Sequence, residues 1–125
     1  MTIEQLTDQI LDFRDKRDWS QYHKAKDMAA AVAIEAAELQ EHFLWKTHDE
    51  SAEHLSKHGD EVAEEMADIA IYLFLMASDA GVDMGQAIKA KLAINEKRYP
   101  VHKAKGRSNK YTAVSYTHLT LPTKA

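Results

Sequence analysis

Two pairs of carboxylates in the middle of the chain have the spacing of a metal site. Glu35 and Glu38 stand three residues apart, and Glu65 and Asp68 repeat that spacing. A separation of three places both members of a pair on one face of an α-helix. Two helices packed face to face would therefore direct four carboxylates at one point. Mg²⁺ takes oxygen ligands and keeps several waters, which leaves room for substrate phosphates, so the pattern predicts a magnesium site.

A ferritin-like di-iron centre is the main alternative in metal chemistry. It requires Glu-x-x-His on two helices, and no Glu in this sequence is followed three residues later by His. The nitrogen ligand that iron chemistry favours is therefore missing from the pattern. His42 follows Glu38 by four positions, but a single histidine of this kind is more often a surface residue.

The stretch that carries the second pair, residues 61–77, is acidic at its start and apolar at its end. Beyond Ile69 it is apolar on every side of a helix, which indicates burial in a bundle or a subunit interface. Unpaired charge is costly to bury, so carboxylates that run into such an interior need a neutralising cation. The side chains predicted to be buried, partly across a subunit interface, are Ile69, Tyr72, Leu73, Leu75 and Met76.

Apolar residues at helical spacing predict three further helices, over residues 3–17, 28–45 and 84–98. Thr2 and Gln5 form a capping-box pattern before the first helix, and Asp27 is the predicted N-cap of the second. Residues 46–58 are polar and without a period, so we predict a loop there. The fold class expected is all-α, a four-helix bundle.

Length and composition indicate one domain, over residues 1–112. Without cysteine the chain has no disulfide and no thiolate metal site. It also has no stretch of about 20 apolar residues and no signal-peptide pattern, so we expect a cytoplasmic protein without a membrane partner. Residues 113–125 change to a Thr-rich composition without helical period. We treat this tail as non-native or disordered and leave it out of the functional argument.

Charge is segregated along the chain although the net charge is only -4. Positions 35–68 hold eleven acidic residues against two lysines, and positions 86–110 hold eight basic residues against one glutamate. The acidic centre disfavours nucleic acid as a partner. A nucleoside triphosphate bridged by a metal suits both halves, and two solvated helix faces of opposite sign are the simpler alternative.

An aromatic connection precedes the first acidic pair. It contains Trp19, Tyr22 and His23. A tryptophan in such a loop covers the core in many proteins. The functional alternative is a stacking surface for a base, with His23 as a hydrogen-bonding partner.

Three segments together resemble the MazG-type all-α nucleoside triphosphate pyrophosphohydrolases. They are EAAELQEHFLW, EEMADIAIYL and INEKRYPVH, with Lys110-Tyr111 beyond. The segment RDWSQYH, ahead of the first acidic pair, is most similar to the dCTP pyrophosphatase branch of that superfamily. The resemblance covers about residues 7–112, and the motifs are specific only in combination.

The resemblance implies hydrolysis of a nucleoside triphosphate, dCTP or a related pyrimidine deoxynucleotide, to the monophosphate and pyrophosphate. It implies nucleotide-pool cleaning with Mg²⁺ as cofactor and a bundle completed as a homodimer or homotetramer. The implied metal ligands are Glu35, Glu38, Glu65 and Asp68, and Glu38 is our candidate for the catalytic carboxylate. The implied nucleotide-binding residues are Trp19, Ser20, Gln21, Tyr22, His23, Trp45, Tyr72, Lys91, Asn95 and Arg98. Tyr99 completes the basic segment, and Ile10 replaces a histidine found in some dCTP-specific members, which leaves the base open.

The alternative function is a non-catalytic homodimeric helical adaptor or regulator whose acidic faces are solvated. It predicts no nucleotide turnover and no effect of Mg²⁺ on stability. A pyrophosphate assay over a panel of deoxynucleotides, with and without Mg²⁺, separates the two.

Overall fold

The structure, a computed structural model, describes residues 1–108, and within them every regular element is helical. The elements are α1 (Ile3–Lys16), the 3-10 helix η1 (Ser20–Tyr22), α2 (Ala25–Glu41), α3 (His48–Asp79), α4 (Met84–Arg98) and α5 (Val101–Ala104). The all-α prediction is confirmed, and the short α5 is an addition to the four helices expected. The predicted tail, residues 113–125, lies outside the described residues.

The chain divides into two compact units, Met1–Met84 and the part from Gly85 onward. The first contains α1, α2 and α3, and the second contains nearly all of α4 with α5. The extent of the functional domain, residues 1–112, stays a prediction.

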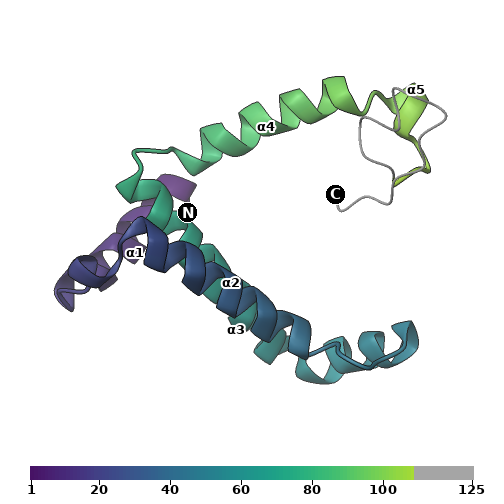
Figure 1. Cartoon of the computed structure of the whole chain (residues 1–125), viewed down its shortest axis with the longest axis horizontal. Coiled ribbons are helices and arrows are strands. Elements are labelled where there is room, and N and C mark those ends of the chain that lie inside the picture. The colour runs from purple at the N-terminus through teal and green to yellow at the C-terminus, as the bar shows by residue number, and fades with distance from the viewer. Residues whose placement is uncertain (109–125) are drawn as a thin grey trace. The chain divides into compact units, whose positions relative to one another are not determined.

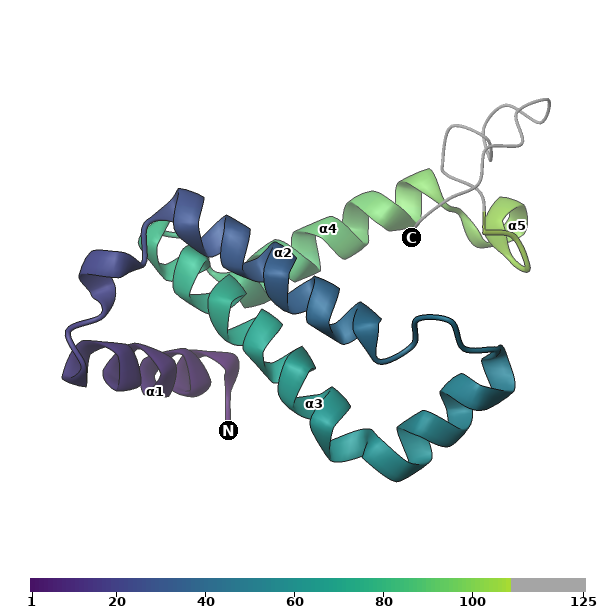
Figure 2. The same ribbon diagram turned by 60° about the horizontal axis from the view of Figure 1, so that its bottom comes forward.

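Helices α2 and α3 form the central pair of the first unit and run side by side in opposite directions (Figures 1 and 2). Helix α1 also packs against α3, over a smaller area. Among the described residues the buried apolar side chains are few: Met28, Val62, Leu75 and Ala77. Three of the four belong to α3, so this helix is the core element of the unit.

Helix α1 begins as its sequence predicts. The Gln5 backbone N–H donates to Thr2 Oγ1 at 3.0 Å, and the Thr2 N–H donates to Gln5 Oε1 at 2.8 Å. This capping box satisfies two N–H groups that the first turn of a helix leaves without a partner.

The loop predicted over residues 46–58 is wrong, because α3 already begins at His48. A second capping box starts it: the Glu50 N–H donates to Thr47 Oγ1 at 3.1 Å, and the Thr47 N–H donates to Glu50 Oε1 at 2.9 Å. The helix is then interrupted at His58, whose φ of -122° and ψ of 28° are not helical. Figure 2 shows the resulting bend in α3. The central stretch that the sequence placed at residues 61–77 is therefore the part of a longer helix that follows a kink.

Helix α2 is shifted toward the N-terminus relative to its prediction. Its N-cap is Lys24 rather than Asp27, which lies in the first turn. It ends at Glu41 rather than at Trp45. The backbone N–H groups that follow Glu41 donate to carbonyls three residues earlier in the chain, as the Phe43 N–H donates to Gln40 O at 2.9 Å. Trp45 then adopts a left-handed conformation with φ of 63°, which an α-helix cannot contain.

The apolar end of α3 is only partly covered by its own chain. Leu75 is buried, Ile69, Tyr72 and Met76 are half-buried, and Leu73 remains 39% exposed. The prediction that a subunit interface covers this surface stays a prediction.

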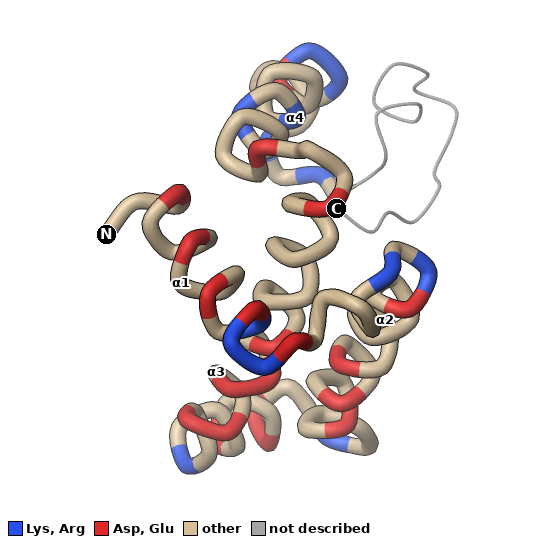
Figure 3. Tube along the Cα trace, turned by 90° about the vertical axis from the view of Figure 1, so that its left-hand side faces the viewer, with Lys and Arg blue, Asp and Glu red and all other residues tan. Residues whose placement is uncertain are grey.

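Charge separates by unit as the sequence predicted. Acidic residues recur along α1, α2 and α3, and basic residues predominate in α4 and α5 (Figure 3). None of the helices in residues 1–108 has the length and apolar content needed to cross a lipid bilayer.

Candidate functional site

The first acidic pair and one member of the second converge between α2 and α3. One carboxylate oxygen from each of Glu35, Glu38 and Glu65 lies within 4.8 Å of the others. Glu35 and Glu38 share a face of α2, and the antiparallel packing brings Glu65 of α3 opposite them. Asp68 lies outside this group of three, but its charge acts on both Glu35 and Glu65.

Burial and mutual repulsion disfavour full ionisation of this cluster. Burial, hydrogen bonding with Glu38 and the charge of Glu38 raise the pKa of Glu35 to about 7. Burial raises the pKa of Glu65 as well; a hydrogen bond with Glu35 opposes this rise, and Glu38 and the charge of Asp68 add to it. At neutral pH the carboxyl groups of this cluster therefore remain partly protonated unless a cation neutralises their charge.

Two oxygens of the cluster lack partners within the described structure. Oε2 of Glu35 and Oε2 of Glu65 are buried and make no hydrogen bond. Buried polar atoms almost always have a partner. An all-carboxylate donor set with unused oxygens fits a hard divalent cation such as Mg²⁺ or Mn²⁺.

A cavity of about 230 Å³ adjoins the acidic cluster within the first unit. Its lining residues are Ile10, Phe13, Arg14, Trp19, His23, Asp68, Ile71, Tyr72 and Leu75. Three of the predicted nucleotide-binding residues (Trp19, His23 and Tyr72) are thus gathered around one space. Asp68 connects the two parts of the site, because it lines the cavity and also acts electrostatically on Glu35 and Glu65.

The aromatic side chains of the cavity form a continuous series of edge-to-face contacts. Ring centroids are 5.8 Å apart for Phe13 and Trp19, 6.4 Å for Trp19 and His23, and 6.4 Å for His23 and Tyr72. Edge-to-face packing holds the rings in place and leaves π-faces that can receive a flat ligand. Nδ1 of His23 is buried without a hydrogen-bond partner, so a polar group of a ligand can pair with it.

Sequence reasoning missed Phe13 and Arg14 of α1. The Arg14 side chain is only 11% exposed, and its Nη1 lies 3.4 Å from Asp79 Oδ1 of α3. Its Nε also donates to Asp15 Oδ1 at 3.0 Å. The available signal was an arginine next to Phe13 on the apolar side of α1, where a charged residue is out of place.

Other predicted binding residues do not line this cavity. Ser20 and Tyr22 of η1 are exposed, and Gln21 donates to the Asp18 carbonyl at 3.0 Å, which supports the left-handed Asp18 (φ 54°). Trp45 is 97% exposed in the connection after α2. The basic-segment residues predicted to bind nucleotide lie on α4, in the second unit: Lys91, Asn95 and Arg98.

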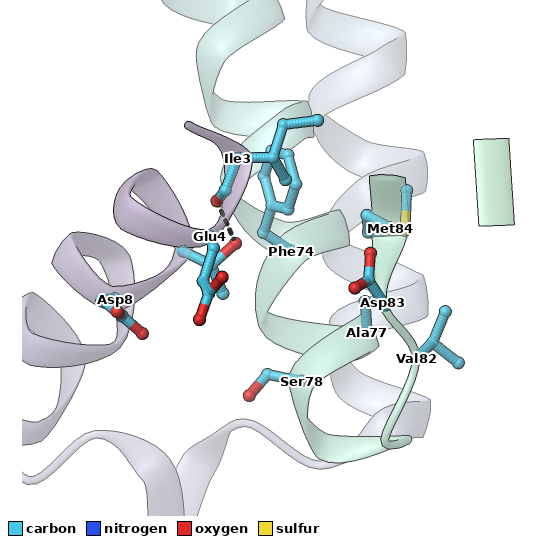
Figure 4. Close-up of a pocket in the computed structure, with 10 residues that line it drawn as sticks. Ile3, Glu4, Asp8, Phe74, Ala77, Ser78, Val82, Asp83 and Met84 are labelled. Carbon is cyan, nitrogen blue, oxygen red and sulfur yellow. Dashed lines mark hydrogen bonds between the residues drawn. The ribbon is translucent and has the colours of Figure 1, made fainter. Parts of the chain in front are cut away.

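A second cavity, of about 170 Å³, lies between the start of α1 and the end of α3 (Figure 4). Ile3, Phe74 and Met84 contribute apolar walls, and Glu4 and Asp83 contribute carboxylates. None of the four predicted metal ligands lines it. We therefore place the candidate site at the acidic cluster and its adjoining aromatic cavity.

Comparison with known proteins identifies the family of the chain. A model of the MazG-like family matches residues 30–114. The chain belongs to the MazG-like family. The match includes both acidic pairs of this MazG-like chain and all of α4, and it begins after the aromatic connection.

Named relatives extend the similarity over most of the chain. The dCTP pyrophosphatase 1 of Bos taurus is 36% identical over 113 residues, which are 89% of this chain and 67% of the relative. The human dCTP pyrophosphatase 1 is 35% identical over 117 residues, or 92% of this chain and 69% of the relative. A solved pyrophosphatase structure from Archaeoglobus fulgidus has a TM-score of 0.75 and 41% identity, covering 78% of this chain and 92% of its own.

Proposed function

We propose that this chain hydrolyses dCTP or a related pyrimidine deoxynucleoside triphosphate to the monophosphate and pyrophosphate, as a nucleotide-pool enzyme. The general class, a nucleoside triphosphate pyrophosphohydrolase, follows from family membership together with the relatives named as pyrophosphatases. The same findings argue against the non-catalytic adaptor. The observation that carries the proposal is the position of Asp68, which joins the carboxylate cluster to the aromatic cavity.

A divalent cation, in our proposal Mg²⁺, would be held by Glu35, Glu38, Glu65 and Asp68. The fit rests on the converging oxygens of the first three and on the unpaired buried oxygens of Glu35 and Glu65. The bound cation would supply neutralisation of phosphate charge and a lower pKa for water.

The protein's own contribution is positioning and proton transfer. Water attacks the α-phosphorus, the bond from that phosphorus to the oxygen that bridges to the β-phosphate breaks, and pyrophosphate departs with the bridging oxygen. Glu38 is proposed to orient the water and accept its proton, because the buried oxygens without a hydrogen-bond partner, which suit a bound cation, belong to Glu35 and Glu65 and not to Glu38. Trp19, His23 and Tyr72 are proposed to hold the base and sugar, so that most of the rate gain comes from orientation.

The test is pyrophosphate release from the four common deoxynucleoside triphosphates, with Mg²⁺ and with a chelator. We expect Glu65→Gln and Asp68→Asn to lower kcat/KM by about 100-fold or more, since a catalytic cation supplies several kcal/mol and each 1.36 kcal/mol is tenfold in rate. Glu64→Gln changes an exposed neighbour on α3 and serves as the control.

Retention of most Mg²⁺-dependent activity by either variant would show that the ligand assignment is wrong. A wild-type preference for purines by tenfold or more, roughly 1.4 kcal/mol, would reject the pyrimidine assignment and leave the reaction class intact.

A further inference from the structure

A nearly buried arginine lies in the wall of the aromatic cavity and has no role in the reaction described above. The Arg14 side chain is 11% exposed and lines the cavity together with Trp19 and His23. Its carboxylate partners, Asp15 and Asp79, are much more exposed, at 58% and 43%. Ion pairs with exposed carboxylates contribute little to stability and do not require a buried guanidinium. The burial of Arg14 therefore has another reason.

The two ion pairs leave part of the Arg14 guanidinium without a partner. Nε donates to Asp15 Oδ1 at 3.0 Å. Nη1 lies 3.4 Å from Asp79 Oδ1, which is longer than the distance of about 2.7–2.9 Å typical of hydrogen bonds between charged groups. Nη2 makes no hydrogen bond to any of residues 1–108. Because a guanidinium carries five N–H donors, donors on its two adjacent terminal nitrogens remain for a ligand in the cavity.

The guanidinium of Arg14 lies toward the end of the cavity that is away from the carboxylate cluster. Asp68, Tyr72 and Leu75 line the cavity at spacings of four and three residues, so they follow one face of α3. Asp79, which holds Nη1 of Arg14, continues that face and lies about 16 Å beyond Asp68 along the helix axis. A nucleotide whose phosphates meet a cation beside Asp68 therefore directs its base toward Arg14.

The neighbouring arginine does not offer the same donors to the cavity. The guanidinium carbon of Arg17 lies 3.7 Å from the centroid of the Phe13 ring, and its Nη1 donates to the Phe13 carbonyl at 2.9 Å. Arg17 is exposed and is not a lining residue. Arg14 is thus the arginine of this region that can read a base.

We propose that Arg14 is a specificity-determining residue whose guanidinium donates to N3 and O2 of cytosine. The inference rests on the proposed function and adds the side chain that separates cytosine from thymine. In cytosine both atoms accept hydrogen bonds, whereas N3 of thymine carries a hydrogen, so a pair of donors fits cytosine alone of these two bases. Arginine reads the adjacent acceptors of guanine in the same manner. Nδ1 of His23 offers a single polar atom, so the two side chains read different parts of the base.

The test compares kcat/KM for dCTP and dTTP in the wild-type chain and in Arg14→Met. The wild type should prefer dCTP by about tenfold or more, roughly 1.4 kcal/mol, and the variant should lose that preference. Both substrates are measured on one preparation, so the fraction of folded protein cancels in the ratio. Lys16→Met is the matched control and should keep the ratio, because Lys16 is an exposed cation of the same helix with its own partner, Asp12, at 2.8 Å.

Arg14→Lys separates base reading from ion pairing. Lysine keeps the positive charge beside Asp79 but lacks the planar pair of donors. We expect this variant to retain the melting temperature of the wild type and to lose the preference for dCTP over dTTP. Recovery of the full preference by Arg14→Lys would show that the charge, and not the pair of donors, is responsible.

A second measurement changes the substrate instead of the protein. In 3-deaza-dCTP a C–H group replaces N3, so wild-type kcat/KM should fall by about tenfold relative to dCTP. Arg14→Met should use the two substrates equally, within about twofold, because the hydrogen bond to N3 is already absent in that variant.

Three results would overturn the inference: no distinction between dCTP and dTTP by the wild type, the wild-type ratio in Arg14→Met, or equal losses with 3-deaza-dCTP in both proteins. Absence of turnover would instead reject the proposed function, and equilibrium binding of dCMP and dTMP would then test Arg14. Tighter binding of dCMP that is lost in Arg14→Met would support the inference. Equal binding of the two monophosphates by the wild type, or no binding of either, would reject it.

Discussion

Glu35 is the residue whose protonation couples the site to the stability of the fold. Its pKa is about 7 in the folded chain against 4.5 for a free glutamate. Between these values the folded state binds more protons than the unfolded state, so the free energy of unfolding falls as pH rises. Carboxylate repulsion in the metal-free protein is thus greatest above pH 7.

The first prediction follows from this decrease in the free energy of unfolding with rising pH. In the presence of a chelator the melting temperature should decrease from pH 4.5 to pH 7 and then level off. Millimolar Mg²⁺ should remove much of the decrease, because it binds the ionised cluster. Glu35→Gln should flatten the metal-free profile, and Glu41→Gln, exposed on the same helix, should not. A metal-free melting temperature that rises over this range would contradict the assignment.

Base recognition is a second matter at the scale of residues. Trp19 packs edge-to-face between Phe13 and His23, and only His23 of the three presents an unpaired buried nitrogen to the cavity. Stacking favours any base, by about 1–3 kcal/mol in single-strand binders, whereas discrimination requires hydrogen bonds. We therefore assign stacking to Trp19 and discrimination between bases to His23.

We accordingly predict that Trp19→Ala raises KM for all four deoxynucleotides by a similar factor. His23→Ala should instead bring their kcat/KM values closer together. Steady-state kinetics on all four substrates decides this, with Tyr22→Ala as a control because that ring is 66% exposed outside the cavity. A uniform effect of His23→Ala would remove it from base recognition.

Among the elements, α3 can be tested at its kink and at its C-terminal end, because a glycine lies at each place. Gly59 is helical, follows the kink, and a Cβ built on it meets no atom within 4 Å. Gly81 ends the helix with φ of +68°, a conformation that side chains with a Cβ adopt at a cost.

Replacing each glycine with alanine should therefore have opposite effects. Gly59→Ala should raise the free energy of unfolding by about 0.5–1 kcal/mol, the helix-interior advantage of alanine. Gly81→Ala should lower it by about 1–2 kcal/mol. Chemical denaturation of both variants measures the difference, and equal signs would mean that the end of α3 is misplaced.

Local signals predicted most of the elements, and the misses have physical causes. The Thr2–Gln5 capping box and the ends of α4 could be read directly because a few neighbouring residues determine them. Residues 48–57 were taken for a loop because a helix that is polar on all sides has no apolar period. The Thr47-x-x-Glu50 capping box was the signal overlooked there.

Part of the candidate site could likewise be predicted from local sequence, and part of it could not. The spacing within each helix was sufficient to predict that the two members of a carboxylate pair share a face. The approach of Glu65 to Glu35 and Glu38 depends on the packing of α2 against α3, and Phe13 and Arg14 enter the cavity only because α1 packs against α3. Such contacts depend on tertiary packing, which periodicity does not encode.

At the scale of the whole molecule, the described core is small for the apolar content of the chain. Leu73 and Met66 of α3 are 39% and 57% exposed, and their spacing of seven residues places them on one face of the helix. Exposed apolar side chains that share a helix face are typical of surfaces that another chain covers. Self-association is the expected consequence, in keeping with the predicted homodimer or homotetramer.

We predict a sedimentation-equilibrium mass that is a multiple of the single-chain mass at micromolar concentration. Leu73→Glu should shift the equilibrium toward the monomer, because it places a charge in the interface. Leu55→Glu, at a comparably exposed position before the kink, is the control. A wild-type chain that sediments as a monomer at every concentration would exclude this interface.

The kink at His58 also divides α3 into lengths that differ in cooperativity. The part before it spans ten residues, and an isolated helix shorter than about 12–15 residues is marginal in water. That part contributes no fully buried side chain, whereas Val62, Leu75 and Ala77 anchor the part beyond the kink. The segment before His58 can therefore unfold while the segment beyond it stays folded. The amide hydrogens of the first segment should then exchange with solvent through a local unfolding event. The long helix then behaves as two cooperative segments, and the segment before His58 opens at the lower free energy.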